Sequence, residues 1–395
     1  MIAALRRLDW LLLAAVLALS GMGALLVWSA THARQLSAGG DPNAYLYRHL
    51  ASLAIGLALA GIVTRFDYRQ LRIHGPVVYL AAVVGLLLVL SPLGRTVNGS
   101  HSWIDLGGGF SLQPSEPAKV ALCVSLALLL TERRASGDGF RSGDVPHTLG
   151  LAAVPIGLVM LQPDLGSAMV LTVIVAGILV IAAVPVRWLT GLALTAAAGA
   201  VAVVRLGLLD QYQIDRFAAF ANPDLDPLGA GYTTEQARIA IGSGGLTGQG
   251  LFHGTQTSGQ FVPEQHTDFI FTVAGEELGF AGAAVLLLLF TTLIYRTCVI
   301  AARADDLFGA LMAGGIGCWF AFQTFVNIGM TLGIMPVTGI PLPFVSYGGS
   351  AMLANLTAVG LLQSVRLHQR VATPQSGELL TADAVTALPR RHRAG

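Results

Sequence analysis

The stretch FVPEQHTDFIFTVAGEELGFAGAAVLLLLF, residues 261–290, contains the transition that decides the fold. It opens as a polar loop that includes Asp268 and then becomes a long apolar run. Such a run predicts a helix in the hydrocarbon core of a membrane, where the backbone must satisfy its own hydrogen bonds and charged side chains are costly. The carboxylates at the start of the run therefore need an explanation.

The composition of the whole chain indicates the same class of protein. Of its 395 residues 54% are hydrophobic and only 11% are charged, and the formal net charge is +1. This balance is typical of a membrane protein. The arginines are dispersed rather than gathered into a patch, so we expect no nucleic-acid partner. Cys123, Cys298 and Cys318 fall in apolar runs without metal-ligand spacing, so we expect neither a disulfide nor a zinc site.

Apolar runs recur along the chain, and ten of them are long enough to cross a bilayer. The sequence predicts an all-α, polytopic membrane protein with about ten transmembrane helices and a large extracytoplasmic loop, residues 207–267, between spans 7 and 8. The expected spans are residues 10–29, 50–63, 77–93, 112–130, 149–161, 167–184 and 188–206, and three more that begin near Asp268, Leu307 and Val345.

The distribution of arginine predicts the orientation. Sixteen arginines lie in the two tails and in the loops on the same side as the tails, against six in or beside the opposite loops. Cytoplasmic loops are enriched in basic residues, so both termini are expected in the cytoplasm. Residues 1–370 then form one integral membrane domain, and residues 371–395, rich in small and polar residues, form a disordered cytoplasmic tail.

Two ionisable residues lie inside an expected span, in the motif QPSEPAK at 113–119. Glu116 and Lys119, the only lysine of the chain, are one helical turn apart, which predicts an ion pair within the helix. One interpretation is that the two charges neutralise each other and only orient the helix. The other is that Lys119 provides a cation for an anionic lipid head group.

The opening stretch carries further polar residues whose roles have simple alternatives. Asp268 could cap the start of a helix, and His266 could be merely hydrogen-bonded rather than a ligand. Glu276 and Glu277 are expected two to three turns into the same helix as Asp268, where helix packing is as reasonable a role as catalysis.

Two segments are rich in residues that break regular structure. IAIGSGGLTGQG, residues 239–250, could form a nest of backbone amides for phosphate, or a flexible turn. PVTGIPLPFVSYGGS, residues 336–350, cannot remain in lipid as a regular helix, so we expect it to line a cavity or fold back into the protein.

Taken together, the motifs resemble the SEDS family, the membrane glycan polymerases of the RodA and FtsW type. The likeness runs from the first span to about Arg370, and GIPLP at 339–343 resembles the RodA branch more than the FtsW branch. The matching motifs are NGSHSWIDLG at 98–107, QPSEPAK, QPDLGS at 162–167, DPLGAGY at 226–232, IAIGSGG, PEQHTDFIF, GEELG and the segment from Asn327 to Ser350.

The resemblance implies an inverting peptidoglycan glycosyltransferase that polymerises lipid II at the outer face of a bacterial cytoplasmic membrane. It implies Asp268 as the catalytic carboxylate, acting as general base or as ligand of a divalent cation such as Mg²⁺ or Mn²⁺. It also implies a class B penicillin-binding protein as partner, beside lipid II and membrane lipids. The residues expected to contact the substrate are Lys119, Glu116, Trp103, Arg216, Arg238, Glu264, His266 and Ser346.

Two other classes of function compete with this one. A lipid II flippase would hold its ionisable groups near the middle of the bilayer, whereas most carboxylates here are expected at the outer face. A non-catalytic scaffold for a transpeptidase would tolerate substitution of Asp268.

Overall fold

The computed structural model describes residues 7–97, 99–134, 142–205 and 229–369, together with Gly207 and Phe220. The predicted tail at 371–395, residue Arg216 and much of the first half of the predicted loop at 207–267 lie outside these residues.

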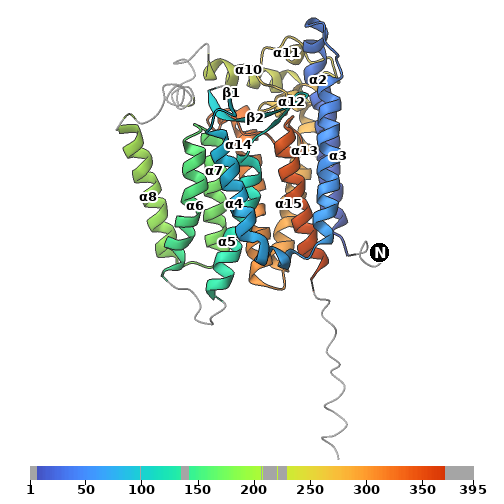
Figure 1. Cartoon of the computed structure of the whole chain (residues 1–395). Helices are drawn as coiled ribbons and strands as arrows, with labels where there is room; N and C mark the ends of the chain where they lie inside the picture. Colours follow the sequence, from blue (N-terminus) through green and yellow to red (C-terminus); the bar gives the residue numbers. More distant parts are fainter. Residues whose placement is uncertain are drawn as a thin grey trace, which may run out of the picture.

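Ten described helices of 17 to 28 residues run side by side between two faces of the molecule (Figure 1). Their number confirms the predicted polytopic fold. Five of them, one counted together with the short helix η1 that precedes it, are long and apolar enough by length and composition to cross a membrane. The ten are α2 (Trp10–Ser37), α3 (Ala44–Arg65), α4 (Leu71–Val89), α5 (Ser115–Arg134), α6 (Asp144–Met160), α7 (Leu165–Ile181), α8 (Val186–Arg205), α13 (Gly279–Ala302), α14 (Leu307–Thr331) and α15 (Gly349–Leu367).

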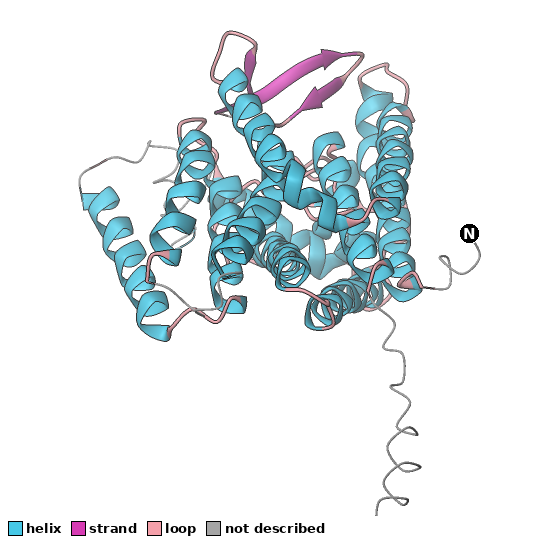
Figure 2. Cartoon of the chain, turned by 60° about the horizontal axis from the view of Figure 1, so that its bottom comes forward, coloured by secondary structure: helices cyan, strands magenta, loops and turns pink. Residues whose placement is uncertain are grey.

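The connections on one face, which we call the loop side, have structure of their own (Figures 1 and 2). The strands pair in the antiparallel order β1-β2-β3, with Arg95 opposite Trp103 and Ile104 opposite Leu112. The elements of the loop side are β1 (Gly94–Val97), β2 (Ser100–Gly107), β3 (Phe110–Leu112), α10 (Ala230–Ser243), α11 (Thr255–Ser258) and α12 (Ile270–Glu277).

The prediction that the eighth span begins near Asp268 is wrong. The short helix α12 ends at Glu277, and the spanning helix α13 starts at Gly279, whose φ of +65° breaks the helix between them. Residues 239–250, the Gly-rich segment, pack closely against this break. A Cβ at Gly279 would lie 2.3 Å from the amide nitrogen of Gly248, so only glycine fits there. That segment therefore serves close backbone packing, and its amides donate to protein carbonyls, as Gln249 N does to Glu276 O.

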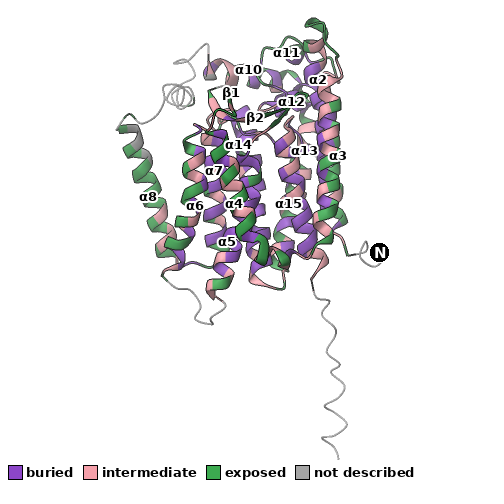
Figure 3. Ribbon diagram, in the orientation of Figure 1, coloured by how far each residue is buried: buried purple, intermediate pink, exposed green. Residues whose placement is uncertain are grey.

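The core of the bundle is centred on α14, which packs against α5, α7 and α13. Its side chains are buried along most of its length, among them Trp319 and Phe320, as the purple colouring of Figure 3 shows. A helix buried on all sides can accept polar groups only where the protein supplies their partners.

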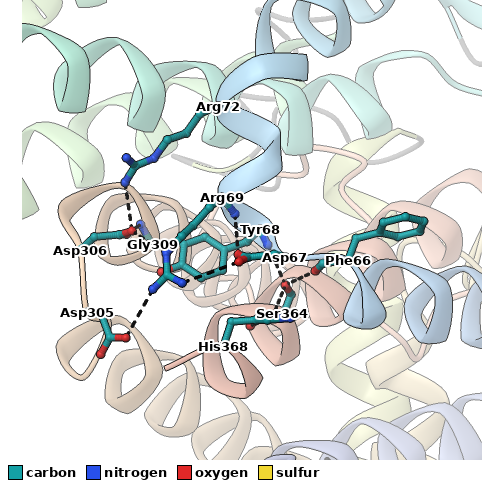
Figure 4. Close-up of polar contacts among 10 residues, drawn as sticks. All are labelled: Phe66, Asp67, Tyr68, Arg69, Arg72, Asp305, Asp306, Gly309, Ser364 and His368. Carbon is teal, nitrogen blue, oxygen red and sulfur yellow. Dashed lines mark hydrogen bonds and ion pairs between the residues drawn. The ribbon is translucent and has the colours of Figure 1, made fainter. Parts of the chain in front are cut away.

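On the face opposite the loop side, a polar cluster fixes the end of α14 (Figure 4). Asp306 accepts from the amide of Gly309 at 2.8 Å and from Arg72 at 2.9 Å, so it caps α14 and ties it to α4. Ser364 on α15 accepts from the amide of Tyr68 in η1 (Tyr68–Gln70). These contacts anchor one end of the helix whose other end reaches the functional site.

Candidate functional site

A cavity of about 860 Å³ lies at the loop-side ends of the helices. Six segments far apart in the chain supply its walls. The polar or aromatic side chains that line it include Ser100, Ser102, Trp103, Gln113, Glu116, Lys119, Asp164, Ser167, Thr233, Glu264, Thr267, Asp268, Thr338 and Tyr347. Residues 336–350, which we call the Pro-Gly segment, contribute residues 337–341, Tyr347 and Gly348 to the wall, which confirms the expectation that this segment lines a cavity.

Asp268 lies in a tight turn at the wall of this cavity. The carbonyl of Glu264 accepts from the amides of Thr267 and Asp268, both at 3.1 Å, and Glu264 itself has a φ of +50°. Opposite the turn lies Gly339, where a Cβ would be in ordinary van der Waals contact with Asp268, 3.5 Å from its Oδ2. The Asp268 carboxylate therefore lies between its own turn and the Pro-Gly segment.

The alternative reading of Asp268 as a helix cap is wrong. The residue at the cap position of α12 is Phe269, whose side chain makes no capping hydrogen bond. Asp268 lines the cavity instead, at an intermediate level of exposure.

The predicted ion pair in α5 is confirmed. Lys119 Nζ lies 2.6 Å from Glu116 Oε1, and the two side chains are only 1% and 2% exposed. The ammonium also donates to Gln323 Oε1 at 3.2 Å and lies 4.9 Å from the centre of the Trp319 ring. An ammonium has three donors, and these two hydrogen bonds use two of them. The pair forms a charged part of the cavity wall.

The remaining predicted substrate contacts divide into two groups. Trp103 and Glu264 line the cavity, whereas His266, Ser346 and Arg238 are not among its lining residues. Burial lowers the pKa of His266, against the opposing effect of Glu264, so its imidazole is expected to be neutral. Ser346 accepts from the amide of Leu342 and donates to the carbonyl of Thr267. Arg238 is exposed on α10.

Glu276 and Glu277, by contrast, accept hydrogen bonds from segments that pack against α12 on the loop side. The Glu276 carboxylate accepts from the amides of Gln256 and Thr257, at 2.7 and 2.9 Å. Glu277 accepts from the hydroxyl of Ser29 and the amide of Phe252. The structure thus favours helix and loop packing over catalysis for both residues.

Glu277 makes the stability of this region depend on pH. Burial raises the pKa of its carboxyl from 4.5 to about 7, and Oε2 is buried without a partner among the described residues. A raised folded-state pKa means that the fold binds the proton more tightly than the unfolded chain. Stability therefore falls as pH rises from about 4.5 to about 7, by about 3 kcal/mol for a shift of this size.

We expect Glu277→Gln to remove this loss, because glutamine keeps the acceptor atom and carries no charge. The thermal midpoint of the detergent-solubilised variant should exceed that of the native protein at pH 8 and not at pH 5. The matched control is Glu276→Gln, which weakens bonds to a charged acceptor worth about 1.5–3 kcal/mol each and should lower the midpoint at both pH values. Equal pH dependence of native protein and Glu277→Gln would contradict this assignment.

Two polar residues of the site lie inside an expected span and were not predicted, because within the spans the prediction rested on ionisable side chains alone. Gln323 and Asn327 lie one turn apart on α14 and are both fully buried. Their amides reach the carbonyls of Pro341 and Asp268. Polar amides inside an apolar span were the available signal, because such groups are costly unless they serve a purpose.

A divalent cation would fit the turn that carries Asp268. In the part of the chain that the structure describes, no three His, Cys, Asp or Glu side chains gather as metal ligands. Asp268 and Glu264 are nevertheless carboxylates of one turn, and both line the cavity. Mg²⁺ is commonly held by one or two carboxylates, with substrate phosphates and water completing its coordination.

The chain is similar to known proteins along nearly its whole length. Residues 9–371 match the model of the FtsW/RodA/SpoVE family, described as cell cycle proteins. The peptidoglycan glycosyltransferase MrdB of Escherichia coli is 38% identical over 365 residues, covering 92% of this chain and 95% of MrdB. Stage V sporulation protein E of Bacillus subtilis is 38% identical over 363 residues, with 92% and 98% covered.

Solved structures agree with these sequence relations. A chain from a peptidoglycan synthase complex that coordinates polymerization and crosslinking superposes with a TM-score of 0.77 at 33% identity, covering 92% of this chain and 99% of that one. The crystal structure of the rod shape determining protein RodA of Thermus thermophilus gives 0.67 at 31% identity, with 92% and 98% covered.

Proposed function

This chain belongs to the FtsW/RodA/SpoVE family, and on that premise we propose that it polymerises lipid II into glycan strands. The enzyme is a peptidoglycan glycosyltransferase of the membrane. The observation that carries the proposal is that one cavity is lined by Asp268, by the Glu116–Lys119 pair and by Trp103. A carboxylate, a cation and an aromatic ring are the groups that a sugar diphosphate reaction needs.

Asp268 is the proposed general base. The 4-hydroxyl of the acceptor GlcNAc attacks the anomeric carbon of the donor MurNAc, and the bond from that carbon to the undecaprenyl diphosphate oxygen breaks on the opposite face. The configuration therefore inverts to give a β-1,4 link. The proton of the hydroxyl passes to the Asp268 carboxylate, because a hydroxyl is a poor nucleophile at neutral pH.

The leaving group needs charge balance more than it needs an acid. Hydrolytic glycosidases use a second carboxyl group to protonate the departing oxygen. A diphosphate departs without that proton if a cation offsets its charge, and Lys119 lies in the wall of the same cavity. A divalent cation held by Asp268 would supply the same neutralisation when bound.

Orientation and partner follow from the same proposal. Lipid II presents its sugars outside the cell, so the loop side faces outward and the two termini lie in the cytoplasm, as the arginine distribution predicts. The GIPLP motif favours a role in cell elongation. The similarity to a chain of a complex that polymerises and crosslinks supports a transpeptidase partner of the class B penicillin-binding type.

The test is glycan synthesis from purified lipid II by the purified protein with its cognate transpeptidase. We expect strands that a muramidase digests, resolved by length on a gel. The same preparation in vesicles, supplied with fluorescent lipid II in one leaflet, separates the alternatives. Lipid transfer between leaflets without polymer would favour a flippase, and neither activity would favour a scaffold.

A further inference from the structure

The buried amide of Asn327 joins the two loops that form the site. Its Nδ2 donates to the carbonyl of Asp268 and to the carbonyl of Ile340, both at 2.7 Å. Its side chain is 0% exposed and is not among the residues that line the cavity. Both N–H groups of the amide are therefore used to hold the turn of Asp268 against the Pro-Gly segment.

Asn327 contributes the bond closest to the carboxylate in a short series. Three successive backbone carbonyls of the Asp268 turn each accept a hydrogen bond. The carbonyl of His266 accepts from the amide of Tyr347 at 2.9 Å, that of Thr267 from the hydroxyl of Ser346, and that of Asp268 from the side chain of Asn327. Each hydrogen bond holds one residue of the turn, so the three together fix the position of the turn relative to the Pro-Gly segment.

The backbone of both loops needs this support. Glu264 in the turn and Phe344 in the Pro-Gly segment have φ values of +50° and +64°, in the left-handed region that residues with a Cβ seldom adopt. Such conformations persist where surrounding contacts over-determine them, and they concentrate at functional sites. Bonds from a rigid helix to both loops are contacts of that kind.

The same helix, α14, also makes a hydrogen bond to Lys119, the cation in the cavity wall. Gln323, one turn before Asn327, donates to the carbonyl of Pro341 at 2.7 Å and accepts from Lys119 at 3.2 Å. The carbonyls of Ile340 and Pro341 are thus held by successive turns of α14, which also contacts Asp268 and Lys119. One helix, α14, thus makes a hydrogen bond to the residue that carries the carboxylate and another to the cation.

From this geometry we propose that Asn327 is a positioning residue, which acts on glycosyl transfer through Asp268 and never touches the substrate. The inference rests on the proposed role of Asp268. Loss of the amide removes this bond to the Asp268 carbonyl and lets the carboxylate shift, and a displacement of about 1 Å can cost about 10²-fold in rate. The cost falls on the chemical step, because the lining residues that contact lipid II are unchanged.

The experiment measures kcat and KM for lipid II polymerisation by the native complex and by Asn327→Ala and Asn327→Asp. Alanine removes both donors and leaves space, whereas aspartate keeps the side-chain volume and removes at least one donor, since a carboxyl group donates through one O–H when protonated and through none when ionised. Each variant should lose about 10- to 100-fold in kcat while KM stays within about threefold of native. If Asn327→Ala does not accumulate in folded form, Asn327→Asp decides the question.

The matched control is Asn355→Ala on α15. Asn355 is 1% exposed and its Oδ1 is unpartnered, as is that of Asn327, yet no hydrogen bond from it reaches either loop within the described residues. The Asn355→Ala variant should have a lower thermal midpoint than the native protein and an unchanged kcat. Native kcat in folded Asn327→Asp would overturn the inference, and so would an equal loss of kcat in Asn355→Ala or a loss confined to KM.

Failure of this inference can be told apart from failure of the proposed function. If the native protein polymerises lipid II and Asp268→Asn does not, the proposed function stands whatever the Asn327 variants do. If Asp268→Asn polymerises as well as the native protein, Asp268 has no catalytic role, and Asn327 cannot act through it.

Discussion

Asp268→Asn is expected to abolish detectable glycan polymerisation while leaving the protein folded and able to bind lipid II. A positioned general base contributes about 10²- to 10⁴-fold in rate, and an amide cannot take a proton from the attacking hydroxyl. The substitution is nearly isosteric. The bond that holds this residue in place runs from Asn327 to its backbone carbonyl and survives the change.

The measurement is strand formation from lipid II by native and variant protein, each with its transpeptidase, and each with and without Mg²⁺ or Mn²⁺. Asp105→Asn is the control: Asp105 lies on the loop side, pairs with Arg95 at 2.9 Å and does not line the cavity. We expect it to keep activity within about twofold, since exposed ion pairs contribute little. Equal polymer from native protein and Asp268→Asn would remove Asp268 from the chemistry.

The second large effect is expected at the buried pair in α5, and a double substitution separates its two interpretations. Lys119→Met leaves the Glu116 carboxylate buried without its cation, which typically destabilises by about 3–5 kcal/mol. Adding Glu116→Gln removes that uncompensated charge. The double variant should therefore recover most of the thermal stability that the single variant loses.

Affinity for lipid II should not recover with stability. A hydrogen bond to a charged group contributes about 1.5–3 kcal/mol, so loss of the Lys119 ammonium from a diphosphate site corresponds to about 10- to 100-fold weaker binding. The measurement is lipid II binding to native, Lys119→Met and Glu116→Gln/Lys119→Met proteins, beside their thermal midpoints. Native affinity in the double variant would mean that the pair only orients the helix.

Local features of the chain were predicted well because their causes are local. The number of spans follows from the lengths of apolar runs, which depend on the thickness of the bilayer. The Glu116–Lys119 pair follows from a spacing of three residues on one helix. The irregular backbone at 336–350 follows from its prolines and glycines, which cannot continue a helix in lipid.

Errors arose where distant segments determine the local structure. The helix that was expected to start near Asp268 breaks at Gly279, because Gly248 packs against that point. The sequence did not decide whether Glu276 and Glu277 serve packing or catalysis. The amides that donate to their carboxylates belong to residues 252–257, outside their own helix. The hydrogen bonds of the Ser346 hydroxyl to Leu342 and Thr267 were likewise not predicted.

The sequence by itself determined a ten-span membrane protein with a carboxylate at a polar boundary, because hydropathy and helical spacing are properties of neighbouring residues. Only the tertiary structure decided how that carboxylate is held. The bond from Asn327 to Asp268 joins residues 59 positions apart, and Gly339 brings a second loop to the same carboxylate. Contacts of this range depend on how the helices pack together, and no pattern within a single span specifies them.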